Sequence, residues 1–354
     1  MNDPSQPLHQ SPAPPSPKPI GPALPGLALL EQLGLGQPDS PSGSTLEFPG
    51  GGRWRVEIPS VEGVRALEVV LEAAQEYDVP VHRVSQGSGV TMLTDSEVGQ
   101  MVQTCTEHEI ELCLFVRPGA NWDTGAARDS VAGSASARSR GAGQLAAGLA
   151  ESQRAADLGV RSLLISDEGL LWSLHQLRER GNLPADLQLK VSIMAAPANP
   201  AALAVHAMLG ADTVNVSSDL SIHQLAELRR ACAVTLDFYV EAPDNVGGFV
   251  RHHEIAEIVR VASPVYLKFG LRNAPDVYPS GAQVEAVVLA SARERVRRAR
   301  LGLDLLARVA DYTMAPLGER RQSALTRFAA PTPLSSWTGA LRATPATNLI
   351  GKIS

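Results

Sequence analysis

The chain has 354 residues, of which 44% are hydrophobic and 19% are charged, and its formal net charge is −6. This length and apolar content allow one large buried core, and a single barrel domain commonly has this size. The negative charge argues against binding to nucleic acid, which normally requires a basic surface. No apolar run reaches membrane-spanning length, so we expect neither nucleic acid nor a membrane as a partner.

The cysteines and the amino-terminal residues both favour an intracellular setting. Cys105, Cys113 and Cys232 occupy apolar positions and lack the spacing of a metal site or a disulfide framework. The first ten residues, MNDPSQPLHQ, contain no positive segment followed by an apolar stretch, as a secretory signal would. We therefore expect buried, inert thiols and a cytoplasmic location.

The two ends of the chain differ in composition from its middle. Residues 1–45 are dense in proline, serine and glycine, as in PAPPSPKPIGPALPG, and such segments bury too little apolar surface to order themselves. Residues 318–354 are again rich in proline, serine and threonine. The composition predicts a disordered amino-terminal arm, a folded domain over 46–317 and an irregular carboxyl-terminal tail.

Within the folded domain, eight short strand-like runs alternate with helix-like stretches. The predicted strands span residues 55–59, 81–84, 111–116, 162–165, 189–194, 213–216, 235–240 and 265–269. The helices that follow them are predicted over 64–77, 96–107, from 141, 170–178, 200–209, 222–231, 248–261 and 283–309. Helix-capping residues support three of the predicted starts, namely Thr94 or Asp95, Asn199 before Pro200, and Ser221. Eight βα units predict a closed (β/α)8 barrel of the TIM type.

Barrels of this type place their active sites at the carboxyl ends of the strands. The polar residues at these predicted ends are Glu57, Ser60, Arg83, Ser85, Gln86, Arg117, Asn121, Asp123, Asp167, Glu168, Lys190, Ser192, Asn199, Asn215, Ser217, Asp219, Asp237, Tyr239, Glu241, Asn245, Lys268, Arg272 and Asn273. A packed barrel interior does not need this much charge. Because unpaired buried charge is costly, such residues are normally paired, solvated or functional.

Three of these residues are candidates for catalysis. Glu57, Glu241 and Lys268 lie on the first, seventh and eighth predicted strands, which are neighbours in a closed barrel. Two carboxylates and an ammonium group could therefore converge for acid–base work, for electrostatic clamping, or for Schiff-base formation by the lysine. The alternative interpretation is a structural network of ion pairs at the rim of the barrel.

Nine further residues are expected to bind the substrate: Arg83, Gln86, Arg117, Asn121, Asp123, Asn199, Asn215, Arg272 and Asn273. Asn121 and Asp123 belong to a long loop after the third strand, which we interpret as a lid or as a mobile insertion. Arg272 and Asn273 follow the eighth strand, and with Gly247-Gly248 after the seventh they could form a phosphate site.

No cofactor is predicted from the sequence. Gly87-Ser88-Gly89 lacks the spacing of a dinucleotide-binding fingerprint. The alternative is a single divalent metal ion held by Glu57, Asp237 or Glu241 together with a histidine.

The segment 189–242 carries a family resemblance. It contains Asn199 at a helix start, Leu209-Gly210-Ala211 before a strand, Ser218-Asp219-Leu220-Ser221 at a turn, and Ala226-Glu227-Leu228 in the next helix. This pattern resembles peptidase family U-32, the collagenase-like peptidases, and implies a barrel with hydrolase activity. The chain departs from the family after the seventh strand, where EAPDNVGG replaces the cysteine-bearing signature.

Three functional hypotheses follow from the sequence. The first, implied by the resemblance, is a U-32-type hydrolase acting on a peptide or small molecule. The second is a lyase or isomerase for a small carboxylate, sugar or phosphate, with Lys268 and Glu241 as acid and base. The third is a non-catalytic binding or accessory protein, and a homo-oligomer is compatible with each of them.

Overall fold

The computed structural model describes residues 41–117 and 138–317, and these residues form a closed barrel of eight parallel strands. Neighbouring strands pair in chain order around the ring, and β8 closes it by pairing with β1. The strands are β1 (Trp54–Pro59), β2 (Arg83–Ser85), β3 (Glu111–Phe115), β4 (Ser162–Ile165), β5 (Gln188–Val191), β6 (Thr213–Asn215), β7 (Thr235–Glu241) and β8 (Val265–Phe269). The predicted (β/α)8 fold is confirmed.

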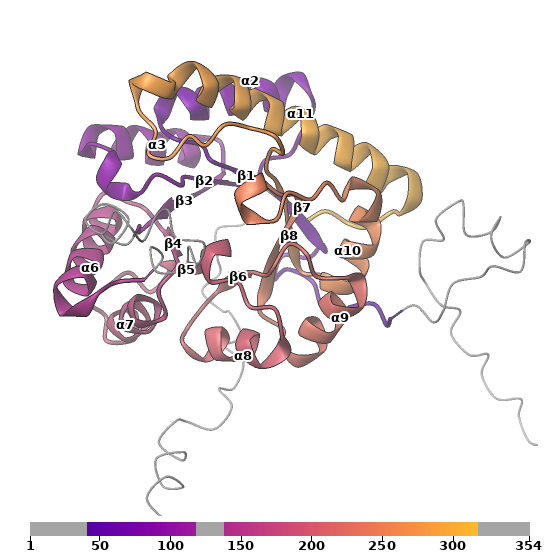
Figure 1. The fold of residues 1–354 in the computed structure, drawn as a ribbon, viewed down its shortest axis with the longest axis horizontal. Coiled ribbons are helices and arrows are strands. Elements are labelled where there is room, and N and C mark those ends of the chain that lie inside the picture. Colours follow the sequence, from indigo (N-terminus) through magenta and orange to yellow (C-terminus); the bar gives the residue numbers. More distant parts are fainter. Residues whose placement is uncertain (1–40, 118–137, 318–354) are drawn as a thin grey trace, which may run out of the picture.

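An α-helix follows each strand, and the helices surround the barrel (Figure 1). They are α2 (Val64–Glu76), α3 (Asp95–Glu107), α6 (Gly141–Asp157), α7 (Glu168–Glu179), α8 (Pro200–Met208), α9 (Ile222–Ala231), α10 (Ile255–Ala262) and α11 (Glu285–Val309). The helix after β7 starts at Ile255 and not at 248 as predicted, because two short 3-10 turns precede it. None of the helices in the described part of the chain is long and apolar enough to cross a membrane.

The predicted capping residues do cap their helices. Thr94 and Ser221 each form a capping box with the residue three positions later, and the Asn199 side chain accepts a hydrogen bond from the Ala202 amide. After α8, Gly210 adopts φ +98°, and a Cβ atom there would lie 2.2 Å from the His175 ring. Only glycine fits this turn, which leads the chain into β6.

The alternation of side chains along the strands separates an apolar layer from a polar one. Val56, Ile58, Val84 and Leu236 are completely buried in the main hydrophobic core. The intervening residues face the inside of the barrel, because successive side chains of a strand point to opposite faces. In the strand register Glu57 lies opposite both Arg83 and Lys268. The fold therefore places charged side chains at one level inside the barrel.

The segments that flank the barrel lie across the start of β1. Arg53 donates from its amide to the Thr313 carbonyl at 2.7 Å, and the Trp54 indole donates to the Tyr312 carbonyl at 2.8 Å. Ser44, which the prediction assigned to the arm, donates from its amide to the Arg260 carbonyl at 2.8 Å. Residues 1–40 of the predicted arm and the whole predicted tail lie outside the described residues.

His82 ties the second strand to this flanking segment. Its Nδ1 accepts a hydrogen bond from the Val56 amide at 3.1 Å, so Nε2 carries the proton that it shares with the Ala315 carbonyl at 3.0 Å. The ring is therefore neutral. Burial lowers the pKa of His82 from 6.5 to about 4, against the opposing effect of the Ala315 carbonyl.

We predict that His82 makes the protein acid-labile. The unfolded state binds more protons than the folded state between pH 6.5 and 4, so the contribution of His82 is complete above pH 6.5 and is lost as the pH falls. The shift corresponds to about 3 kcal/mol. Urea unfolding of the wild type and of His82→Gln should show a difference in unfolding free energy that shrinks by this amount from pH 7 to pH 4. Parallel pH curves for the two proteins would contradict the prediction, and the exposed His108→Gln is the control.

Candidate active site

The inside of the barrel holds a cluster of six charged residues, which we call the barrel charge cluster. Its members are Glu57, Arg83, Glu111, Lys190, Asp237 and Lys268, from six of the eight strands. Glu57, Arg83, Lys190 and Asp237 are completely buried, and Lys268 is 2% exposed. Three carboxylates face three cations, so the cluster can be neutral as a whole.

Glu57 is the centre of the cluster. Its Oε2 contacts the Lys190 ammonium and lies 3.1 Å from Arg83 Nη1, and its Oε1 lies 3.3 Å from Lys268 Nζ. Burial alone would raise the pKa of Glu57, but the charges of Lys190, Lys268 and Arg83 hold it well below its usual range. The carboxylate is therefore ionised at any physiological pH.

Lys268 is held by three neighbours near the carboxyl end of β8. It donates to Asn215 Oδ1 at 2.6 Å, pairs with Glu57, and lies 4.2 Å from the centroid of the Tyr239 ring. Burial raises the pKa of Tyr239, so its phenol remains protonated and can serve as a hydrogen-bond donor. An ammonium group and a phenol thus lie together at the carboxyl end of the barrel.

Arg295 is a buried cation without a direct ion pair in the described residues, although its charge opposes the rise that burial causes in the pKa of the Glu62 carboxyl. It reaches from α11 to the end of β1, is 4% exposed, and donates one hydrogen bond, at 3.3 Å, to the Ser60 carbonyl. Its Nε has no partner, and no carboxylate of the described residues forms an ion pair with it. The charge of Arg295 also lowers the pKa of the Tyr239 phenol, against the larger effect of burial, which raises it. A buried guanidinium that lacks a direct ion pair is a candidate anion-binding group.

The loop between β8 and α11 covers this region. Tyr278 contacts the Ser60 hydroxyl, and the Ser280 amide donates to Ser88 Oγ at 2.8 Å. Ser60 itself adopts φ +60°, a conformation that a residue other than glycine rarely takes. Backbone strain of this kind clusters at functional sites, so it adds weight to the position of Arg295.

Glu241 does not join Glu57 and Lys268, although the sequence analysis expected all three to converge. Its side chain is completely buried, lies 3.2 Å from His252 Nε2 and 3.5 Å from Arg298 Nη1, and accepts from the Arg272 amide at 3.0 Å. A β-bulge between Tyr239 and Glu241 is the reason, because it places Glu241 opposite Phe269 and breaks the alternation. Burial opposes the ionisation of Glu241, but His252 and the Arg272 amide lower its pKa.

The predicted substrate-binding residues fall into separate groups. Arg83 and Asn215 belong to the interior with Glu57 and Lys268. Gln86 is buried and bonds both the amide and the carbonyl of Gly89, and Asn199 caps α8. Arg117 donates to the Gly87 carbonyl at 2.8 Å and lines a cavity of about 240 Å³ beside α6. Only some of the predicted residues therefore meet.

The predicted phosphate site is filled by the chain itself. Arg272 Nε lies 2.9 Å from Asp244 Oδ1, and the Asn273 amide donates to Asp244 Oδ2 at 2.5 Å. These bonds lower the pKa of the Asp244 carboxyl, the hydrogen bond from the Asn273 amide contributing most. Asn121 and Asp123 lie outside the described residues, as does most of the predicted lid.

No metal site is apparent in the parts of the chain that the structure describes, and Cys105 and Cys113 are buried while Cys232 is partly exposed. No group of three or more histidine, cysteine, aspartate or glutamate side chains there could hold a metal ion. Glu57 and Asp237 face Arg83 and Lys190, while Glu241 faces His252. Burial raises the pKa of the Cys105 thiol to about 12 and that of Cys113 to about 11. Neither thiol supplies a thiolate at neutral pH.

Sequence reasoning missed Arg295 as a site residue, because it lies within a run of charged residues in the last predicted helix. The signal was present, since Arg295 continues the buried stripe of α11 that includes Val288, Ala292, Ala299 and Leu303. Lys190 and Asp237 were among the polar strand residues but were not selected. Their importance depends on how the strands are staggered around the ring, which the sequence does not display.

Comparison with known proteins assigns this chain neither a family nor a reaction. No protein-family model and no curated protein matches the sequence. Among solved structures, the U32 peptidase Mk0906 is 17% identical with a TM-score of 0.37, over 66% of this chain and 99% of that chain. The tryptophan synthase complex of Pyrococcus furiosus is 11% identical with a TM-score of 0.41, over 72% and 97%. A 3-hexulose-6-phosphate synthase is 12% identical with a TM-score of 0.38, over 70% and 99%.

These similarities span a peptidase, a synthase of a sugar phosphate and an amino-acid synthase, all at low identity. The resemblance to peptidase family U-32 is therefore distant and confined to the fold. At such TM-scores the similarities carry no argument about the reaction. The class that the structure defines is a (β/α)8 barrel with a buried charge cluster, and the function has to be inferred from the site.

We predict that Glu57→Gln lowers the free energy of unfolding by about 3–5 kcal/mol, because three buried cations lose their shared carboxylate. Urea denaturation at pH 7 measures the loss. The matched control is Glu76→Gln, which breaks an exposed ion pair with Arg293 and should cost less than about 1 kcal/mol. Equal losses in the two variants would contradict the assigned role of Glu57.

Proposed function

We propose that the protein is an enzyme that performs acid–base chemistry on a small anion at the carboxyl end of its barrel, as a lyase or isomerase does. The observation that carries the proposal is the buried Arg295, which forms no direct ion pair in the described residues and acts electrostatically on Tyr239, the neighbour of Lys268. A carboxylate or phosphate group of a substrate would form the direct ion pair that Arg295 lacks.

The site residues can be given distinct roles. Arg295 binds the anionic group of the substrate, while Lys268 faces the reacting carbon or oxygen atom. Its ammonium group stabilises negative charge that develops there and donates a proton, and Glu57 and Asn215 fix its position. The protonated Tyr239 phenol donates a second hydrogen bond. The runner-up assignment of the sequence analysis is thus changed, with Glu57 replacing Glu241 as the carboxylate beside the lysine.

The burial of the site favours a small substrate over a peptide chain. Lys268, Tyr239 and Arg295 are each less than 10% exposed, and the loop that carries Tyr278 contacts Ser60, whose carbonyl accepts from Arg295. An extended peptide needs an open groove, whereas a small molecule needs only a brief opening of this loop. Hydrolysis of the kind implied by the family resemblance stays a prediction, and the assays below include it.

The first test concerns anion binding. Malonate and phosphate should raise the melting temperature of the wild type. Arg295→Gln should weaken their binding about 10- to 100-fold, which is the affinity that a hydrogen bond to a charged group contributes. The control Arg293→Gln lies on the same helix but is exposed, so it should bind as the wild type does. If neither anion binds, or if both variants bind equally well, the proposed site is wrong.

The second test concerns catalysis by Lys268. Small carboxylates and sugar phosphates that bind are screened by NMR for solvent deuterium incorporation, and fluorogenic peptides are screened for cleavage. Lys268→Met should lower kcat for the active substrate about 10²- to 10⁴-fold, the usual contribution of an acid–base group, while Lys268→Arg retains part of it. Full activity in Lys268→Met would exclude the lysine from the reaction. Peptide cleavage that depends on Lys268 would favour the hydrolase instead.

A further inference from the structure

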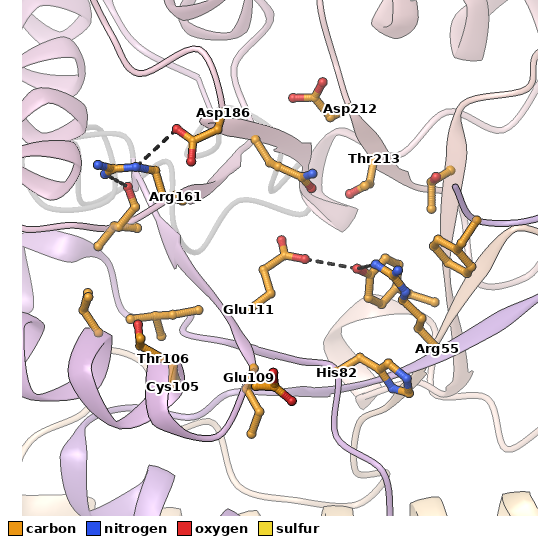
Figure 2. A pocket seen from close by; sticks show the side chains of 18 of the residues that line it. Arg55, His82, Cys105, Thr106, Glu109, Glu111, Arg161, Asp186, Asp212 and Thr213 are labelled. Atoms are coloured by element: carbon orange, nitrogen blue, oxygen red, sulfur yellow. Dashed lines mark hydrogen bonds and ion pairs between the residues drawn. The ribbon is translucent and has the colours of Figure 1, made fainter. Parts of the chain in front are cut away.

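A second cavity lies at the opposite end of the barrel, where the strands begin. It has a volume of about 350 Å³ and is lined by the starts of several strands and by the end of α3. Figure 2 shows Arg55, His82, Glu111 and Thr213 around this space, with Arg161 and Asp186 paired at its edge. The volume is within the range of small-molecule sites. The proposed catalytic residues Lys268, Tyr239 and Arg295 do not line it.

Most charged groups of the cavity wall are hydrogen-bonded or ion-paired within the protein. Arg55 donates to the Tyr266 hydroxyl at 3.1 Å, the hydroxyl donates to Glu111 Oε2 at 3.0 Å, and Glu111 Oε1 pairs with Arg83 Nε at 3.0 Å. His82 is neutral, as described above. Near the edge, Asp212 pairs with the buried Arg178. Glu109 also lines the cavity but is exposed to solvent, so the buried part of the wall offers no uncompensated charge to an anionic or a cationic ligand.

Uncharged hydrogen-bonding capacity remains at the inner end. Thr213 lines the cavity and is 4% exposed, and its hydroxyl has no partner. Ser162, which lies opposite the cavity-lining Gln188 in the strand register, is completely buried and its hydroxyl is also without a partner. Because buried hydroxyl groups are normally hydrogen-bonded, these two indicate bound water or a ligand with hydroxyl groups.

Apolar side chains form another part of the same wall. Val102, Ile110, Leu112 and Val160 line the cavity beside the hydroxyl-bearing residues. Water alone gains little from such a surface, whereas a polyol presents both C–H faces and hydroxyl groups. We propose that this cavity is a binding site for a neutral polyhydroxylated molecule, such as a monosaccharide or cyclitol.

The test uses D-xylose and myo-inositol as neutral probes, with D-glucose 6-phosphate and D-glucosamine as charged counterparts. Saturation-transfer difference NMR on the full chain should detect a neutral probe. Thr106→Trp, which fills the mouth of the cavity from an exposed position of α3, should abolish the signal. Ser96→Trp, on the same helix but away from the cavity, should leave the signal unchanged.

Thr213→Val keeps the shape of the side chain but removes its hydroxyl, and should weaken binding about two- to tenfold, the value of one neutral hydrogen bond. Arg295→Gln should leave this binding unchanged, so the two sites can fail independently. The probes are used at about 20 mM, a concentration that detects millimolar dissociation constants. The proposal would be overturned if neither neutral probe binds, or if binding survives Thr106→Trp. Preferential binding of either charged probe would also overturn the ligand class.

Discussion

The structure depends on one constraint, the cost of burying Glu57 inside the barrel. A carboxylate removed completely from water is tolerated only when cations and hydrogen-bond donors replace the solvent. Arg83, Lys190 and Lys268 do so from three different strands, and the Ser85 hydroxyl adds a hydrogen bond at 2.7 Å. The stagger of the strands is therefore coupled to the charges, because a shift of one residue would turn these side chains outward.

This arrangement also separates the two ends of the barrel. The barrel charge cluster fills the middle of the interior, where many barrels carry layers of branched apolar side chains. Tyr239 and Arg295 belong to the carboxyl end, and Thr213 and the 350 Å³ cavity belong to the amino end. One buried network thus lies between two regions with different chemistry, one with a cation that lacks a direct ion pair and one with hydroxyl groups that lack a hydrogen-bond partner.

The sequence predicted the fold well because the barrel repeats a local pattern. Strand-like runs, capping residues such as Thr94 and Ser221, and the turn at Gly210 are local signals, and they agree with the observed elements. The convergence of Glu57 and Lys268 could also be predicted, since neighbouring strands bring them together. The position of Glu241 could not, because a single bulge in β7 reverses its direction.

Arg295 shows the other limit of sequence reasoning. A charged residue within a charged helical run looks solvated unless the apolar stripe of the helix is followed through it. Its significance becomes visible only when the end of β1 and the β8–α11 loop are seen to enclose it. Function at this site depends on contacts between distant segments, and no periodicity in the sequence reports them.

The most direct test of the account is a crystal structure of the wild type grown with malonate. The account predicts malonate bound to the Arg295 guanidinium, with Tyr239 and Lys268 beside it and the β8–α11 loop closed over it. The account would be contradicted if the contacts of Arg295 are unchanged and no malonate is bound at the carboxyl end of the barrel.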